Sequence, residues 1–168
     1  MKKLLAIFTI ITLFSCSAKK NTASVNNEFC HEEGNCTVEI FKNKSMILHE
    51  EGGLHYEMAH SNTKNVIVYR YDKTSHLHLG DAVTDGDYRE EIVFEIDKDL
   101  HTGQISDVRL QNTKMLFGRF CFCKGAAGYF KVTKGNLKIE KHKKRHKINL
   151  DFTINEVPQL INKVEIVL

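Results

Sequence analysis

Apolar and polar residues alternate strictly near the end of the chain. Residues 147–154 read Lys, Ile, Asn, Leu, Asp, Phe, Thr, Ile. Successive side chains of a β-strand point to opposite faces, so this order gathers four apolar side chains on one face. They are Ile148, Leu150, Phe152 and Ile154. The segment is therefore predicted to be a strand with one buried face.

The strand before it is predicted from a weaker form of the same pattern. Leu137 and Ile139 alternate with polar residues, and Gly135 precedes them in a predicted turn. A hairpin is expected from about residue 136 to 154, with its tip in residues 140–147, which read Glu-Lys-His-Lys-Lys-Arg-His-Lys.

Residues 119–123 are a predicted strand with apolar side chains on both of its faces. Phe120 and Phe122 share one predicted face, and Cys121 and Cys123 share the other. A strand of this kind is expected to be covered on both sides.

Further short segments have the β-branched and aromatic composition of strands, and turn residues separate them. They are residues 37–41, 46–49, 54–58, 65–71, 88–96, 104–110, 113–117 and 163–168. No segment shows a convincing run of apolar residues at helical spacing. The predicted fold class is all-β, a single antiparallel β-sandwich or β-barrel domain of about nine or ten short strands.

The first sixteen residues have the order of an export signal. A charged start, Lys2 and Lys3, precedes an apolar run at 4–14, which is too short to span about 30 Å of hydrocarbon. The run ends in Leu-Phe-Ser-Cys at 13–16, which resembles the lipobox of bacterial lipoproteins. The resemblance implies cleavage before Cys16 and acylation of this residue, with palmitate among the candidate acyl groups. Because Ser17 is not aspartate, it also implies sorting to the outer membrane if the cell has one. An ordinary signal peptide with a chance cysteine is the alternative.

Composition then divides the chain into three parts. Residues 1–15 are the predicted signal peptide, and the small polar residues at 16–27 are predicted to be the lipidated cysteine and a flexible tether. Residues 28–168 are long enough for one domain with its own core. Loss of Lys2 and Lys3 lowers the formal charge from +3 to +1. A nearly neutral domain carries no general footprint for nucleic acid.

Four cysteines remain after Cys16, and an even number in an exported protein favours disulfides. Cysteines two apart on one extended strand would have Cα atoms about 6.5–7 Å apart, at the limit for a bridge. We therefore expect at least one bridge between the two pairs, which are Cys30 with Cys36 and Cys121 with Cys123. A Cys-x-Cys site with histidine for copper or zinc is the alternative.

Metal-binding patterns are sparse. His76 and His78 share one face of a predicted strand and could hold copper or zinc, although exposed histidines beside a turn are the favoured interpretation. The tetrapeptide His-Glu-Glu-Gly occurs at 31–34 and 49–52 and is interpreted as two acidic turns, with paired metal loops as the alternative. Asp81, Asp85 and Asp87 do not have the spacing of an EF-hand loop. No metal or cofactor is therefore expected.

No catalytic motif is present: the chain has no Gly-x-Ser-x-Gly elbow and no glycine-rich phosphate loop. We expect a lipid-anchored module of the bacterial cell envelope with a binding or structural role and no enzymatic one. A metal-handling protein or an enzyme that uses the histidine-rich segments is the alternative.

The basic residues of the predicted tip are the candidate binding site. They are Lys141, Lys143, Lys144, Arg145 and Lys147. Such a cluster attracts anionic lipid, acidic glycan or an acidic envelope protein. A charged tip that prevents edge-to-edge aggregation is the alternative.

Overall fold

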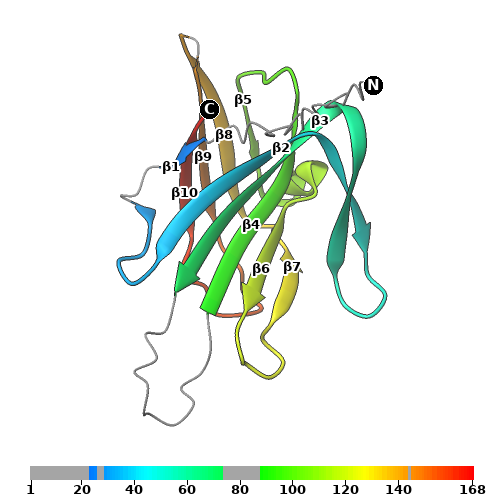
Figure 1. Ribbon diagram of the computed structural model, residues 1–168, viewed down its shortest axis with the longest axis vertical. Helices are drawn as coiled ribbons and strands as arrows, with labels where there is room; N and C mark the ends of the chain where they lie inside the picture. The colour runs from blue at the N-terminus through cyan, green and yellow to red at the C-terminus, as the bar shows by residue number, and fades with distance from the viewer. Residues whose placement is uncertain (1–22, 26–28, 74–87, 144) are drawn as a thin grey trace, which may run out of the picture.

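The computed structural model describes residues 23–25, 29–73, 88–143 and 145–168. Within them two antiparallel sheets lie face to face as a sandwich (Figure 1). The first sheet, in spatial order, contains β1 (Ser24–Val25), β10 (Lys163–Val167), β9 (Arg145–Phe152), β8 (Gly135–His142) and β5 (Gly103–Ser106). The second contains β2 (Asn35–His49), β3 (His55–Lys73), β4 (Tyr88–Asp97), β6 (Leu116–Phe120) and β7 (Gly128–Lys131). A 3₁₀-helix, η2 (Asp107–Thr113), follows β5.

The core lies between the two sheets, and the alternating segment supplies one side of it. Ile148 and Leu150 are fully buried, Phe152 is 3% exposed, and Ile154 just beyond the strand is also buried. They face apolar residues of the second sheet, including Phe117, whose ring centroid is 5.9 Å from that of Phe152. The predicted all-β class and the shared face of these four residues are confirmed.

The β8–β9 hairpin also has the predicted position. Leu137 pairs with Leu150 and Ile139 with Ile148, and the last pair before the turn is His142 with Arg145. The turn therefore falls within the predicted tip. Gly135, at the base of β8, has φ of +143°, and a Cβ there would lie 2.2 Å from the Asp151 carbonyl oxygen, so this position requires glycine.

Two strands are much longer than predicted. β2 has 15 residues and β3 has 19, and each joins two segments that were expected to be separate strands. At residues 42–45 the sequence suggested a turn, but the structure has a bulge in which residues 61–64 face only Asn43. Asn43 has φ of +56° and its amide donates to Oδ1 of Asn65. The strand β2 therefore continues through the bulge and does not reverse direction there.

Beyond this bulge, residues 44–60 form a hairpin that we call the arm. Figure 1 shows it leaving the sandwich and bending beside β6 and β7. Met46 of the arm is fully buried against Val66, Val93 and Leu116 on the outer face of the second sheet. This second cluster explains why residues 90–96 of β4 are all buried, because the arm covers the face that would otherwise meet water.

The structure also differs from the predictions in its short elements. Residues 104–110 are only partly a strand, since β5 ends at Ser106 and η2 follows. Ser24 and Val25, expected in the tether, pair with Val167 and Ile166.

Candidate functional site

Several predicted site residues lie outside the described residues. They are Cys16, His76, His78 and Lys144, together with the aspartates of the 81–87 loop. The acylation of Cys16 therefore stays a prediction.

The four remaining cysteines form two disulfides, but each bridge lies within a pair. Cys30 bonds Cys36 and Cys121 bonds Cys123, so the expected bridge between the two pairs is wrong. The expectation failed because β6 ends at Phe120 and the next residues turn instead of staying extended. The Cα atoms of Cys121 and Cys123 are 5.2 Å apart, within the usual range for a disulfide. The predicted cover on both faces is also absent, since Phe122 is 92% exposed.

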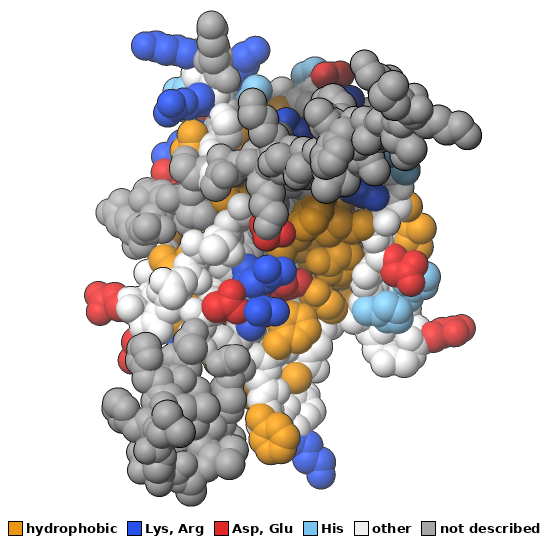
Figure 2. Space-filling view, viewed as in Figure 1, with side chains coloured by type: hydrophobic (Ala, Val, Ile, Leu, Met, Phe, Trp, Pro, Cys, Tyr) orange, Lys and Arg blue, Asp and Glu red, His pale blue; other side chains and the backbone are white. Residues whose placement is uncertain are grey.

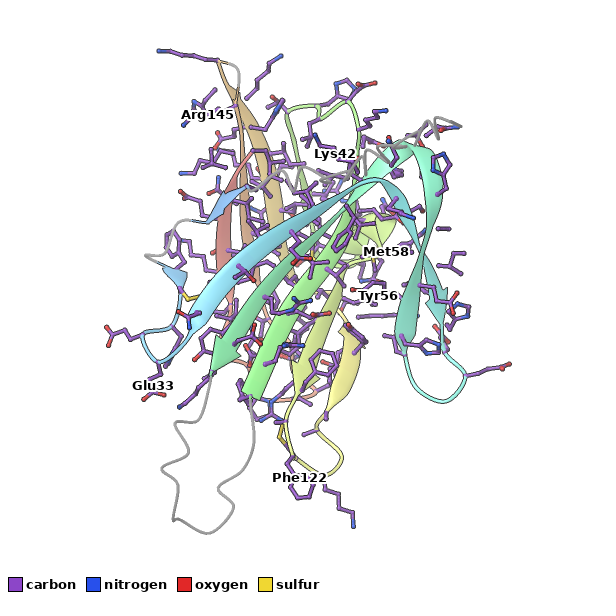
Figure 3. The ribbon with its side chains drawn as sticks, viewed as in Figure 1. Glu33, Lys42, Tyr56, Met58, Phe122 and Arg145 are labelled. Atoms are coloured by element: carbon purple, nitrogen blue, oxygen red, sulfur yellow. A yellow bond between two sulfur atoms is a disulfide. The ribbon has the colours of Figure 1, made fainter. Side chains whose placement is uncertain are left out.

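The basic tip of the β8–β9 hairpin projects from one end of the sandwich. Figure 2 shows Lys and Arg side chains gathered there, and Figure 3 places Arg145 at this end. Lys141, Lys143 and Arg145 are exposed, and within the described part of the chain no ion pair involves them. Lys147 differs, because its Nζ is 2.7 Å from Oε2 of Glu165. The structure thus brings three of the predicted cations together and pairs a fourth.

An acidic residue lies at the base of the tip. Glu140 accepts a hydrogen bond from Lys138 at 2.7 Å, and this bond, with the charges of Lys138, His142 and Lys147, lowers the pKa of its carboxyl. Glu140 is therefore ionised at neutral pH and is compensated by Lys138. It leaves the positive charge of the outer tip largely intact.

The chain enters the first sheet at the same end as the basic tip. Ser24 pairs with Val167, which pairs with Lys147, so these three residues form one row across the sheet. The next residue of β1, Val25, lies one row farther from the tip, level with Ile148. The strand β1 therefore begins on the side of the tip and runs away from it. The sequence alone could not place this junction, because two residues carry no periodic signal.

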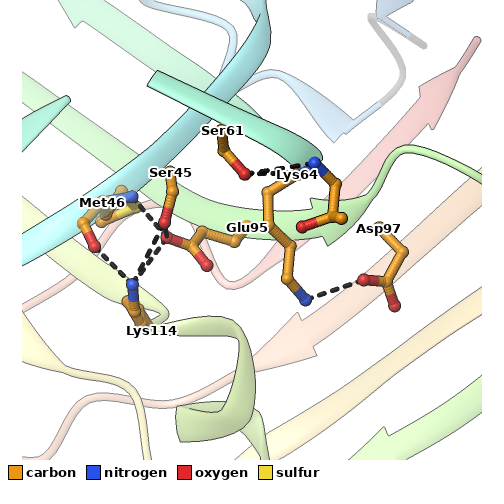
Figure 4. Close-up of polar contacts among 8 residues, drawn as sticks. Ser45, Met46, Ser61, Lys64, Glu95, Asp97 and Lys114 are labelled. Carbon is orange, nitrogen blue, oxygen red and sulfur yellow. Dashed lines mark hydrogen bonds and ion pairs between the residues drawn. The ribbon is translucent and has the colours of Figure 1, made fainter. Parts of the chain in front are cut away.

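A polar cluster holds the arm on the second sheet (Figure 4). Glu95 is buried on the outer face of β4 and accepts hydrogen bonds from Ser45 Oγ at 2.7 Å, Lys114 Nζ at 2.9 Å and the Met46 amide. Lys114 also donates to the Met46 carbonyl. Burial alone would raise the pKa of Glu95, but these bonds and the charge of Lys114 outweigh it and lower the pKa.

A second buried carboxylate, Glu91, lies four residues before Glu95 on the same face of β4. Glu91 accepts hydrogen bonds from Arg70 Nε at 3.4 Å and from the Tyr129 hydroxyl. Burial first, and then Glu91, raise the pKa values of Tyr129 and of Tyr56; Glu91 acts on Tyr129 mainly through the hydrogen bond and on Tyr56 through its charge. The two tyrosine rings meet edge to face with centroids 5.3 Å apart. Both carboxylates are thus fully partnered, which suits a structural role and not that of a general base. The sequence signal for them was the presence of glutamates inside an otherwise apolar strand.

An apolar surface remains between the arm and the second sheet. Figure 2 shows a continuous apolar area there, and Figure 3 shows Tyr56 and Met58 of the arm pointing toward it. A separate hollow of about 380 Å³ lies between the two sheets near Leu100, Ile105 and Ile139. Its rim carries the Lys64–Asp97 ion pair, with the two side chains 2.8 Å apart. A hollow of this lining can admit a small apolar ligand.

Histidines meet at the end of the arm. The imidazoles of His49 and His55 stack with centroids 5.0 Å apart, and His49 Nε2 is 3.9 Å from a Glu57 carboxylate oxygen. Among the residues that the structure describes, no group of three or more His, Cys, Asp or Glu side chains could hold a metal ion. The two His-Glu-Glu-Gly segments lie at turns at opposite ends of β2, so they do not form one site.

No protein-family model matches the sequence, and no curated protein or solved structure shows significant similarity to it. Within the described ranges, no helix has the length and apolar character needed to cross a membrane.

Proposed function

We propose that this protein is a lipid-anchored binding module of the bacterial cell envelope that docks on anionic headgroups through its β8–β9 tip. The observation that carries the proposal is the position of Ser24 in the row of Lys147, at the end of the domain that carries the basic tip. An anchor at Cys16 would hold this end, and not the opposite one, toward the membrane.

Chain length supports contact between the tip and the headgroups. Ser24 lies eight positions after Cys16, and a fully extended chain covers at most about 3.3–3.6 Å per position, or about 26–29 Å. The turn at residue 143 lies four residues beyond Lys147, or about 13 Å at strand spacing. The tether is long enough to let the tip reach the surface in which the lipid is anchored. It is also short enough to keep the domain close to that surface.

The charge distribution favours the same orientation. The chain after residue 15 carries +1, and the five cations of the tip leave −4 on the remainder. The tip is thus attracted to an anionic surface while the rest of the domain is weakly repelled. Each basic residue near such a surface contributes about 1 kcal/mol, and the attraction fades as salt rises.

Binding to vesicles tests the proposal with a chain that begins at Ser17 and keeps every strand described above. The triple variant Lys141→Gln, Lys143→Asn, Arg145→Gln removes three charges from the tip. Asn suits position 143, where φ is +58°. The loss of about 3 kcal/mol should weaken binding to phosphatidylglycerol vesicles about 100-fold at low salt. The difference should shrink in high salt.

A matched control removes the same charge elsewhere. Arg109, Lys124 and Lys134 are exposed on loops and on η2, away from the tip, and their replacement by Gln should leave binding nearly unchanged. Equal binding by the tip variant and the unmodified chain at low salt would refute the proposal. Retention of acidic polysaccharide but not of vesicles would replace the lipid surface with a glycan. Separately, Cys16→Ala should release the full chain from membranes during fractionation.

A further inference from the structure

The two disulfides of this protein have different surroundings. Cys30 and Cys36 pack against the main core cluster. Cys121 and Cys123 lie in the loop between β6 and β7, and among the described residues they belong to neither apolar cluster. Phe122 between them is 92% exposed, and Figure 3 shows it at the end of the molecule opposite Arg145. All four cysteines are half-buried, but one disulfide packs against the core and the other lies in a loop tip.

The Cys121–Cys123 bond is not needed to hold its loop. The Ala126 amide donates to the Cys123 carbonyl at 3.1 Å, and Arg119 Nη1 donates to the Ala126 carbonyl at 3.0 Å. Four residue pairs join β6 to β7 below the loop. A bridge between residues only two apart also closes a very small loop, so it restricts the unfolded chain little. Neither local geometry nor stability accounts for this bond.

We propose that Cys121–Cys123 is a thiol–disulfide exchange site that oxidises dithiols of exported proteins, with Phe122 as the apolar contact for the substrate. Both cysteines are half-buried and flank the exposed Phe122 at the loop tip, so an incoming thiolate can approach the bond, which is the requirement for exchange. The adjacent side chain of Lys124 is exposed and positively charged, and a nearby cation favours the cysteine thiolate that departs. An exposed aromatic side chain beside the sulfur atoms suits unfolded chains, which present apolar residues.

The exchange balances in two steps. A substrate thiolate attacks one sulfur of the Cys121–Cys123 bond; that bond breaks, a mixed disulfide forms, and the released cysteine thiolate takes up a proton. The second substrate thiol loses its proton and attacks the substrate sulfur of the mixed disulfide, which frees the other cysteine. The substrate dithiol loses two electrons and becomes a disulfide, and the two cysteines gain them and become thiols. The proposal does not rest on membrane docking, since the two sites occupy opposite ends of the domain.

Partial reduction provides the first test. The full chain in detergent micelles is exposed to reduced glutathione, quenched with acid, alkylated and mapped by mass spectrometry. Cys121 and Cys123 should become alkylated at least tenfold faster than Cys30 and Cys36. Equal rates, or faster reduction of the Cys30–Cys36 bond, would overturn the proposal. The circular dichroism spectrum should be unchanged after selective reduction.

Substrate specificity provides the second test. A reduced peptide that carries two cysteines flanked by apolar residues is compared with dithiothreitol, which has no apolar flank. Phe122→Ser should slow oxidation of the peptide about fivefold or more and leave the rate with dithiothreitol unchanged. If the variant changes neither rate or both rates equally, Phe122 is not a docking residue and this part of the proposal fails. Cys123→Ser, in which Cys121 remains, should form a stable mixed disulfide with an oxidised peptide; absence of that adduct would count against exchange at this loop.

Discussion

Removal of the Glu95 carboxylate should release the arm from the second sheet. Glu95→Ala leaves the buried Met46 amide and the Lys114 ammonium without their shared acceptor. An orphaned buried donor costs about 1–3 kcal/mol, and loss of one partner of a buried ion pair costs more. The Lys114 side chain is 38% exposed and can turn to water, which limits its share. We expect the free energy of unfolding to fall by about 2–4 kcal/mol in urea titrations.

A control is available on the same strand. Asp97→Ala removes the ion pair with Lys64. The Lys64 side chain is 34% exposed and the Asp97 side chain is 61% exposed, and an exposed pair contributes less than about 1 kcal/mol. Equal costs for Asp97→Ala and Glu95→Ala would refute the reasoning. The double variant Glu95→Ala, Lys114→Ala should cost less than the sum of its two single variants, because each already breaks the shared contact.

The pH dependence of stability should change in the same experiment. The pKa of Glu95 is lowered in the folded protein, so its contribution is complete above the ordinary value of 4.5 and is lost as pH falls through the lower folded value. Glu95→Gln should remove this acid-side loss. An unchanged acid profile would show that folding does not lower the pKa of Glu95.

Two further predictions test the core and the tyrosines. Phe152→Ala should lower the free energy of unfolding by about 3–5 kcal/mol, because this side chain is buried in the core. Asp151→Ala should lower it by less than about 1 kcal/mol, because the Asp151 side chain is exposed and lies 3.9 Å from Lys163. Similar costs for the two variants in urea titrations would contradict the burial of Phe152. All five tyrosines have a raised pKa, largely because of burial, and the pKa values of Tyr69 and Tyr88 are raised to about 12. Their contribution to stability is complete below about pH 10 and is lost as pH rises through the folded values, so ultraviolet absorbance at about pH 11 should show fewer tyrosinates in the native protein than in urea.

The fold class and the β8–β9 hairpin could be predicted because period-2 alternation is a local property. Residues 147–154 carry their burial pattern in their own order, and the basic residues beside them mark the tip. The arm could not be predicted, because a bulge at Asn43 and a turn have similar polar sequences. Only the tertiary fold decides that the chain continues there.

The basic residues of the candidate site could be predicted from the sequence, but their position relative to the start of β1 could not. Lys141, Lys143 and Arg145 were found from charge alone. Their relation to Ser24 depends on pairing between residues more than a hundred positions apart, which leaves no local signal. The disulfide pairing failed for a related reason: the estimate assumed an extended strand through Cys121, and the strand ends one residue earlier.

Energy transfer from single tryptophans to a lipid-linked acceptor tests the proposed orientation most directly. The chain has no tryptophan, so His142→Trp reports only on the tip and Phe122→Trp only on the opposite end. The strand β9 alone spans about 23 Å between the two ends. With the full chain in anionic vesicles, transfer should be strong from position 142 and weak from position 122. Equal transfer from both positions, or stronger transfer from position 122, would contradict docking through the basic tip.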